Sequence, residues 1–267
     1  MPAGRAYLTG FERMLAVCEK KPFMPHRPDK AISNELEWWL DTISTGAASR
    51  PILPPPTYHD LDTFSDASTG VGIGIIIGQR WRAWRLLPDW QTRDGKRDIA
   101  WAEAVGFELL LETISSTFPQ HPHVIVYCDN TSVVESWRIG RHRNNAVNSV
   151  FKRIHALLAH SSSPITGVIA KFIPTEHNPA DSPLRGTYGP RHFVLPPIPI
   201  PQHLQQFIID FEHPSTPSEL RALADGRYAP TAAKLVDCLK REQEVNKRTD
   251  AIRAKDDHLI LHSLTRQ

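Results

Sequence analysis

A short, wholly apolar run near the middle of the chain, Val124 to Cys128, limits the folds open to this sequence. Successive side chains of a strand point to opposite faces, so a run without polar positions must be covered on both faces. Short apolar runs of this kind are typical of central strands in α/β proteins. We therefore expect a sheet with helices packed against it.

The segments around this run follow strand-like and helix-like patterns in turn. Three closely spaced strands come first, joined by turn residues that suit antiparallel hairpins. The expected strands are Leu61–Ala67, Val71–Ile77, Arg80–Leu87, Val124–Cys128 and Val168–Ile173, and the expected helices are Ile99–Ile114, buried on one face, and Ala146–Ala159. This order predicts an α/β fold with a mixed five-stranded sheet flanked by helices.

Two proline clusters, at 51–56 and 195–201, divide the chain into three parts. Proline removes amide donors and favours extended backbone, so we interpret both clusters as semi-rigid connectors. We expect a helical segment at 1–56, a central domain at 57–187, and a proline-rich linker with a helical, charged tail at 188–267. On this division the central domain should fold without its flanks.

The composition excludes several classes of protein. Hydrophobic residues make up 40% and charged residues 22% of the chain, which excludes wholesale disorder. The three cysteines stand far apart, which excludes a disulfide framework or a cysteine zinc cluster. No apolar run approaches the ~20 residues of a membrane helix. We expect a soluble, intracellular protein without a membrane partner, whose net charge of +2 leaves nucleic-acid binding to local patches.

Four carboxylates occupy informative positions in this order of elements. Asp66 ends the first strand, and Asp129 follows the apolar strand. Glu103 lies in the first helix, and Asp181 follows the last strand. Acids gathered at one edge of a sheet repel one another unless cations neutralise them, and their hard oxygen atoms suit Mg²⁺ or Mn²⁺. We predict that these four residues are catalytic and together hold two such ions, the apparatus of phosphodiester hydrolysis.

Each acid stands within a short motif: FSDAS at 64–68, WAE at 101–103, YCDN at 127–130 and NPAD at 178–181. In order and content these motifs resemble the ribonuclease H domain of retroelement reverse transcriptases, especially those of DIRS-like and related eukaryotic elements. The resemblance covers the central half of the chain. It implies a ribonuclease H-like fold that cuts the RNA strand of RNA–DNA hybrids with two Mg²⁺ or Mn²⁺ ions.

The resemblance extends upstream and also raises one further candidate. Pro2–Leu8 and Leu36–Leu40 are similar to the end of a polymerase thumb and the connection that follows it, which implies an origin in a retroelement polyprotein. Many ribonucleases H carry a mobile histidine shortly before the fourth acid. His177 is the nearest candidate here, with an exposed loop histidine as the alternative. A closing helix after Asp181 is expected to be short or missing.

Four residues near the second aspartate are candidates for contacts with nucleic acid. Asn130 and Ser132 open the helix after Asp129, where they would either cap it or hold a phosphate or 2′-hydroxyl. Arg141 and Arg143 follow that helix and would meet backbone phosphates, unless they belong to a solvated loop.

Two other interpretations compete with a ribonuclease H. A degenerate remnant would keep the fold and bind nucleic acid without cutting it, although the intact acids argue against this. A DDE transposase or integrase is disfavoured because its glutamate comes last, whereas Glu103 lies between the first two aspartates.

Overall fold

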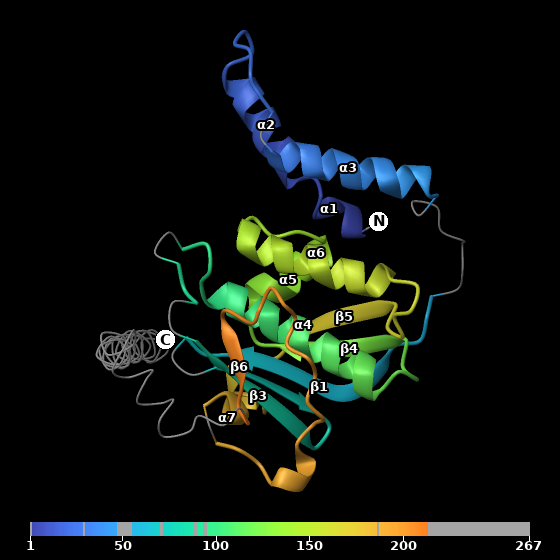
Figure 1. The fold of residues 1–267 in the computed structure, drawn as a ribbon, viewed down its shortest axis with the longest axis vertical. Helices are drawn as coiled ribbons and strands as arrows, with labels where there is room; N and C mark the ends of the chain where they lie inside the picture. Colours follow the sequence, from blue (N-terminus) through green and yellow to red (C-terminus); the bar gives the residue numbers. More distant parts are fainter. Residues whose placement is uncertain are drawn as a thin grey trace, which may run out of the picture. The chain divides into compact units, whose positions relative to one another are not determined.

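A six-stranded mixed sheet organises the protein in this computed structural model (Figure 1). The structure describes residues 2–28, 30–46, 55–69, 72–87, 90–92, 95–185 and 187–212. One compact unit comprises Met1–Phe211, and a second comprises Glu212–Gln267. The predicted helical, charged tail lies outside the described residues. Within the described residues, no helix combines the length and the apolar character that crossing a membrane requires.

The strand order is β5-β4-β1-β2-β3-β6. β1 (His59–Ala67), β2 (Gly72–Ile77) and β3 (Arg80–Leu86) pair in sequence as antiparallel neighbours. β4 (His123–Cys128) runs parallel to β1, and β5 (Gly167–Phe172) runs parallel to β4. The α/β class, the mixed sheet and all five predicted strands are confirmed, with bounds that differ from the prediction by a residue or two at each end.

A sixth strand, β6 (Ile208–Asp210), corrects the prediction of a five-stranded sheet. It pairs antiparallel with β3 at the edge of the sheet. The segment before it buries Leu195 and Leu204, although prolines surround them. The segment at 188–211 therefore packs on the sheet and differs from the linker that the prolines predicted, because apolar side chains between the prolines find cover on β3 and α4 (Ile99–Thr117).

A buried arginine fixes this segment to the sheet. Arg82 of β3 is only 1% exposed, and its guanidinium forms an ion pair of 2.7 Å with Asp210 of β6. The same guanidinium donates to the carbonyl oxygen of Leu195 at 2.5 Å. The indole of Trp81 stacks on Tyr188 with ring centroids 5.2 Å apart. Residues beyond 187 thus complete the core of the first unit.

Helix α4 lies between the sheet and α6 (Asn145–Ala159) (Figure 1). Every residue of its 101–111 stretch is buried, whereas the apolar pattern predicted burial on one face only. Its buried Glu108 is paired with Arg153 of α6 at 2.7 Å and with His203 at 3.2 Å. Burial alone would raise the pKa of Glu108, but hydrogen bonds from these two partners hold it below its usual value. Because its charge is paired in this way, Glu108 does not prevent α4 from being buried on its second face.

The N-terminal segment is helical, as predicted, with α1 (Pro2–Arg5), α2 (Thr9–Lys20) and α3 (Lys30–Ser44). Polar contacts attach it to α6. The side-chain amide of Asn148 donates to the carbonyl oxygen of Ala6 at 2.9 Å. Lys152 forms an ion pair of 3.4 Å with the buried Glu35 of α3. These helices therefore belong to the same compact unit as the sheet.

Candidate metal centre

The register between two parallel strands places two of the predicted acids side by side. Ser65 of β1 is the partner of Cys128 of β4. Because the strands run in the same direction, the next residue on each, Asp66 and Asp129, lies at the same edge of the sheet. β4 is buried on one face and only half-buried on the other, which corrects the expectation that both faces of this apolar run are fully covered. The strand ends at Cys128, so the chain delivers Asp129 to this edge at the first position outside the strand.

Glu103 reaches this edge from α4. Possible ligand atoms of Glu103, Cys128 and Asp129 lie within 4.8 Å of one another, and the Cys128 thiol points to a Glu103 oxygen at 3.9 Å. The glutamate is 5% exposed. Burial, and next the charges of Asp66 and Asp129, raise the pKa of Glu103 well above its usual value. The carboxyl group thus sits where a negative charge is costly without a cation.

Asp66 is 4% exposed, so a negative charge on its carboxyl group is also costly. Burial raises the pKa of Asp66 to about 7, and the charges of Asp129 and Asp181 add to the rise. The backbone amide of Ala67 donates to the Asp66 carboxyl at 2.7 Å and partly opposes it. The charges of Asp129 and Asp181 thus act on Asp66, and those of Asp66 and Asp129 act on Glu103.

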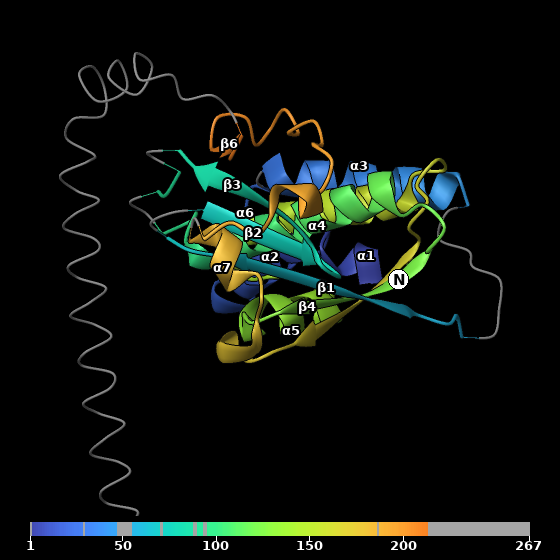
Figure 2. The same cartoon turned by 90° about the horizontal axis from the view of Figure 1, so that it is seen from below.

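The fourth acid depends on a glycine in the neighbouring strand. α7 (Asp181–Leu184) lies directly on β2 and β3 (Figure 2). A Cβ at Gly74 would lie 2.6 Å from the carbonyl oxygen of Ala180 and 2.9 Å from the backbone nitrogen of Leu184. The sequence-based prediction gave Gly74 no such role. No local sequence pattern marks a glycine whose missing side chain makes room for a helix packed on its strand.

Asn178 is a second positioning residue that the prediction used only as part of a motif. Its side chain is buried and donates to the carbonyl oxygen of Ser65 at 3.1 Å. The same side chain accepts a hydrogen bond from the backbone amide of Ala180 at 3.2 Å. It therefore ties the start of α7 to β1 one residue before Asp66, and so holds Asp181 near the other acids.

We expect Gly74→Ala to displace α7 and to lower the free energy of unfolding. The new methyl group would overlap backbone atoms that cannot swing aside, and overpacking of this kind costs about 1–3 kcal/mol. Thermal unfolding would measure this loss of stability. Gly106→Ala is the matched control: it lies on α4, where the nearest neighbour of the new Cβ would be the Ile73 side chain at 3.2 Å, and the Ser65 Cβ and the Asp66 carbonyl oxygen would lie at ordinary contact distances of 3.7 and 3.8 Å. Equal behaviour of the two variants would contradict this role of Gly74.

The donor atoms of the cluster suit a hard cation. One carboxylate oxygen of Asp129, Oδ1, is buried and has no hydrogen-bond partner among the described residues. Burial, and next the charge of Glu103, raise the pKa of Cys128 well above its usual value, so this residue stays a neutral thiol and a poor ligand. The remaining donors are carboxylate oxygens, which Mg²⁺ and Mn²⁺ prefer. The residues present therefore fit such an ion.

His177 lies apart from this arrangement. It is exposed at the end of a 3₁₀ turn (Thr175–His177), directly before Asn178. Among the residues that the structure describes, no hydrogen bond or ion pair joins its ring to the four carboxylates. The exposed loop position that was the alternative for this histidine is the one observed.

Three of the four candidates for nucleic-acid contacts have hydrogen-bond or ion-pair partners among the described residues. Asn130 caps α5 (Thr131–Ile139) by accepting a hydrogen bond from the Val133 amide at 3.2 Å. The Ser132 hydroxyl lies 3.1 Å from a ring nitrogen of the buried His142. The remaining two are Arg141, which forms an ion pair with Glu12 of α2, and Arg143, which is exposed. Capping, one of the two predicted roles of Asn130, is confirmed.

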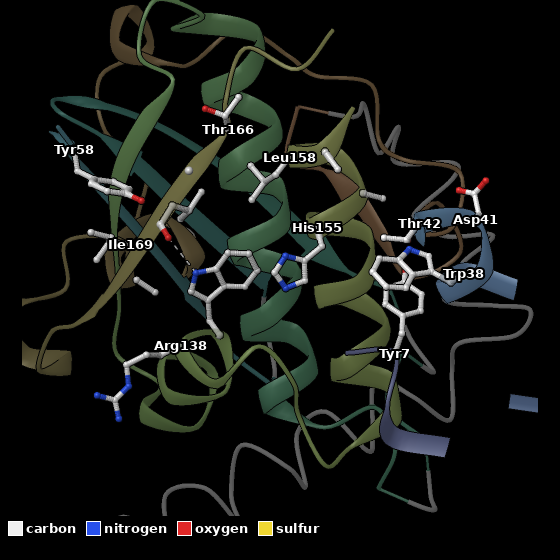
Figure 3. Close-up of a pocket in the computed structure, with 16 residues that line it drawn as sticks. Tyr7, Trp38, Asp41, Thr42, Tyr58, Arg138, His155, Leu158, Thr166 and Ile169 are labelled. Atoms are coloured by element: carbon white, nitrogen blue, oxygen red, sulfur yellow. Dashed lines mark hydrogen bonds between the residues drawn. The ribbon is translucent and has the colours of Figure 1, made fainter. Parts of the chain in front are cut away.

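A cavity of about 590 Å³ lies between the N-terminal helices, α6 and β5 (Figure 3). None of the four acids lines it. Tyr7 stacks on Trp38 with centroids 4.0 Å apart, and Trp137 stacks on His155 at 4.7 Å. Because these rings stack on each other, they leave few open faces for a nucleic-acid base. The cavity is therefore separate from the carboxylate site.

The chain thus combines a mixed sheet flanked by helices with two aspartates at the ends of two parallel strands and two further acids nearby, one on α4 and one on α7. Comparisons with protein-family models, with curated proteins and with solved structures found no match. A functional interpretation must therefore come from the geometry of this cluster and from the motifs around it.

Proposed function

We propose that this chain is a metal-dependent endonuclease with a ribonuclease H-like domain, which hydrolyses the RNA strand of RNA–DNA hybrids. The observation that carries the proposal is the convergence of four acids from separate elements: Asp66 from β1, Glu103 from α4, Asp129 after β4 and Asp181 from α7. A fold does not gather four mutually repelling acids at one edge of a sheet for stability alone.

The arrangement suggests how the residues would share the work. Asp66 and Asp129, which are neighbours across two strands, would share in holding the ions, and Glu103 and Asp181 would add further carboxylate ligands. Bound Mg²⁺ or Mn²⁺ would activate the attacking water and stabilise the leaving oxygen. Asn178 and Gly74 would keep Asp181 in position, and the packing of α4 in the core would keep Glu103 in position.

The motifs support a more specific origin. The order of the four acids and their short motifs resemble the ribonuclease H domains of retroelement reverse transcriptases, and the N-terminal helices coincide with the segments similar to a thumb and connection. We therefore propose a retroelement-derived enzyme with a hybrid as its partner. Protein contacts to such a hybrid would be to phosphates and 2′-hydroxyl groups, which distinguish an RNA strand from DNA.

A labelled hybrid tests this function directly. Purified protein should cut the RNA strand in the presence of Mg²⁺ or Mn²⁺, should leave it intact with a chelator, and should not cut duplex DNA of the same sequence. Binding of the hybrid without cleavage under any of these conditions would instead support the catalytically inactive remnant. Absence of both binding and cleavage would contradict the proposed function altogether.

A further inference from the structure

One arginine lies against the carboxylate cluster. Arg185 directly follows α7, and its Nε donates to a carboxylate oxygen of Asp181 at 2.7 Å. Its influence extends beyond this partner. Burial and the neighbouring acids raise the pKa of Asp66, and the positive charge of Arg185 opposes that rise. Arg185 thus acts as a partial counter-charge for Asp181 and Asp66.

The ion pair leaves most of this guanidinium open. The Arg185 side chain is 60% exposed, and that of Asp181 is 34% exposed. A guanidinium carries five N–H donors, and within the described part of the chain only the Nε group of Arg185 is seen to donate. Exposed pairs of this kind contribute little to stability. A purely structural role therefore leaves the position of this arginine unexplained.

The backbone fixes the place from which the side chain extends. The amide of Arg185 donates to the carbonyl oxygens of Asp181 and Ser182, at 3.3 and 3.2 Å. The preceding Leu184 is buried at 2% exposure against the sheet, where Gly74 makes room for it. The side chain is therefore exposed at its tip but anchored at its base, beside the carboxylate cluster.

We propose that Arg185 binds a phosphate of the substrate strand beside the carboxylates, and that Asp181 holds its guanidinium until a cation takes that carboxylate. This inference rests on the proposed nuclease function. A cation and the guanidinium compete for the same oxygen atoms of Asp181, because both are positive. Once released, the planar guanidinium matches two phosphate oxygens, a geometry that lysine lacks.

The proposal predicts opposite effects of one substitution on two ligands. In Arg185→Gln the competitor for Asp181 is gone, so Mg²⁺ should bind several-fold more tightly. The hybrid should bind about 10-fold more weakly, and the slope of log affinity against log salt concentration should fall by about one, as expected for one lost phosphate contact. Arg185→Lys keeps the positive charge but lacks the planar guanidinium. Its affinity for the hybrid should therefore lie between that of Arg185→Gln and that of the parent.

Both quantities can be measured on the full chain without relying on cleavage. Mg²⁺ affinity follows from the rise of the melting temperature during titration with MgCl₂. Hybrid affinity follows from fluorescence anisotropy at several salt concentrations, with an RNA strand blocked by 2′-O-methyl groups. Arg138→Gln is the control, because this exposed arginine lines the cavity described above and not the carboxylate cluster.

The outcomes separate this inference from the nuclease proposal. Unchanged hybrid affinity and salt slope in Arg185→Gln, or weaker Mg²⁺ binding, would overturn the role of Arg185 even if the parent cleaves hybrids normally. A parent that binds Mg²⁺ and hybrid but never cleaves would overturn the nuclease, while the two affinities would still decide the role of Arg185. A parent that binds neither ligand would overturn both.

Discussion

Asparagine in place of Asp129 is expected to abolish cleavage of the hybrid while leaving the metal-free protein at least as stable as the parent. The substitution removes a candidate ligand, and loss of even an outer partner of metal ligands costs about 10–100-fold in activity or affinity. It also removes a charge that raises the pKa of Asp66 and Glu103, so the remaining acids repel one another less.

Mg²⁺ should raise the melting temperatures of the parent and of Asp129→Asn by different amounts. A ligand present at 100 times its Kd stabilises the folded state by about 2.7 kcal/mol, which corresponds to roughly 5–10 °C in melting temperature for a chain of this size. We expect this rise in the parent and much less of it in Asp129→Asn. Hybrid binding, which uses phosphate and 2′-hydroxyl contacts, should survive in the variant.

Asp62→Asn is a suitable control for this experiment. Asp62 lies on the same strand as Asp66 but is exposed, and its φ of 52° is in the left-handed region that asparagine tolerates. It should keep both cleavage and the response to Mg²⁺. The nuclease proposal fails if Asp129→Asn strongly destabilises the metal-free protein and Mg²⁺ has no effect on the parent, because Asp129 would then be a structural residue.

A chain that ends at residue 187 is expected to lose cooperative folding, whereas one that ends at residue 212 should melt like the parent. The shorter chain lacks Leu195, Leu204 and Ile208, each buried to within 2% of full burial. Each such side chain contributes about 1.5–3 kcal/mol, so their sum approaches the whole stability of a typical domain. Arg82 would also lose both of its partners in the 195–210 segment.

Near-UV circular dichroism and thermal unfolding of the two truncated chains would measure this effect. The longer chain keeps the first compact unit up to Phe211 and β6, so it serves as the matched control. If the shorter chain unfolds cooperatively at the parent's melting temperature, residues 188–211 are an appendage, as the proline pattern predicted, and the domain does end near residue 187.

Local sequence patterns were sufficient to predict most of the elements. Period-two and continuous apolar runs lie within single segments, and so do the turns that separate β1, β2 and β3. The candidate acids were equally accessible. An acid placed directly after an apolar strand, as Asp129 is, can be assigned to a sheet edge from the sequence alone. The short motifs then supplied the order that links the four acids.

Features that depend on which surfaces meet were not predictable in this way. β6 is three residues long and finds its partner on β3 more than a hundred positions earlier in the chain, so no local pattern marks it. Arg82 is a charged residue that a sequence pattern would place in solvent, yet Asp210 from that distant strand allows its burial. α4 is likewise buried on its second face because α6 and residues of the 188–211 segment, such as His203 and Phe207, cover it.

The sequence by itself determined most of the strands and helices and which acids stand near their ends, since both follow from neighbours within a few positions along the chain. Only the tertiary structure decided that Gly74 admits α7, that Asn178 ties it to β1, and that Arg82 is paired with Asp210. The physical reason is that close approach and charge pairing depend on distances between segments remote in sequence, and these exist only after the sheet and its covering helices have packed.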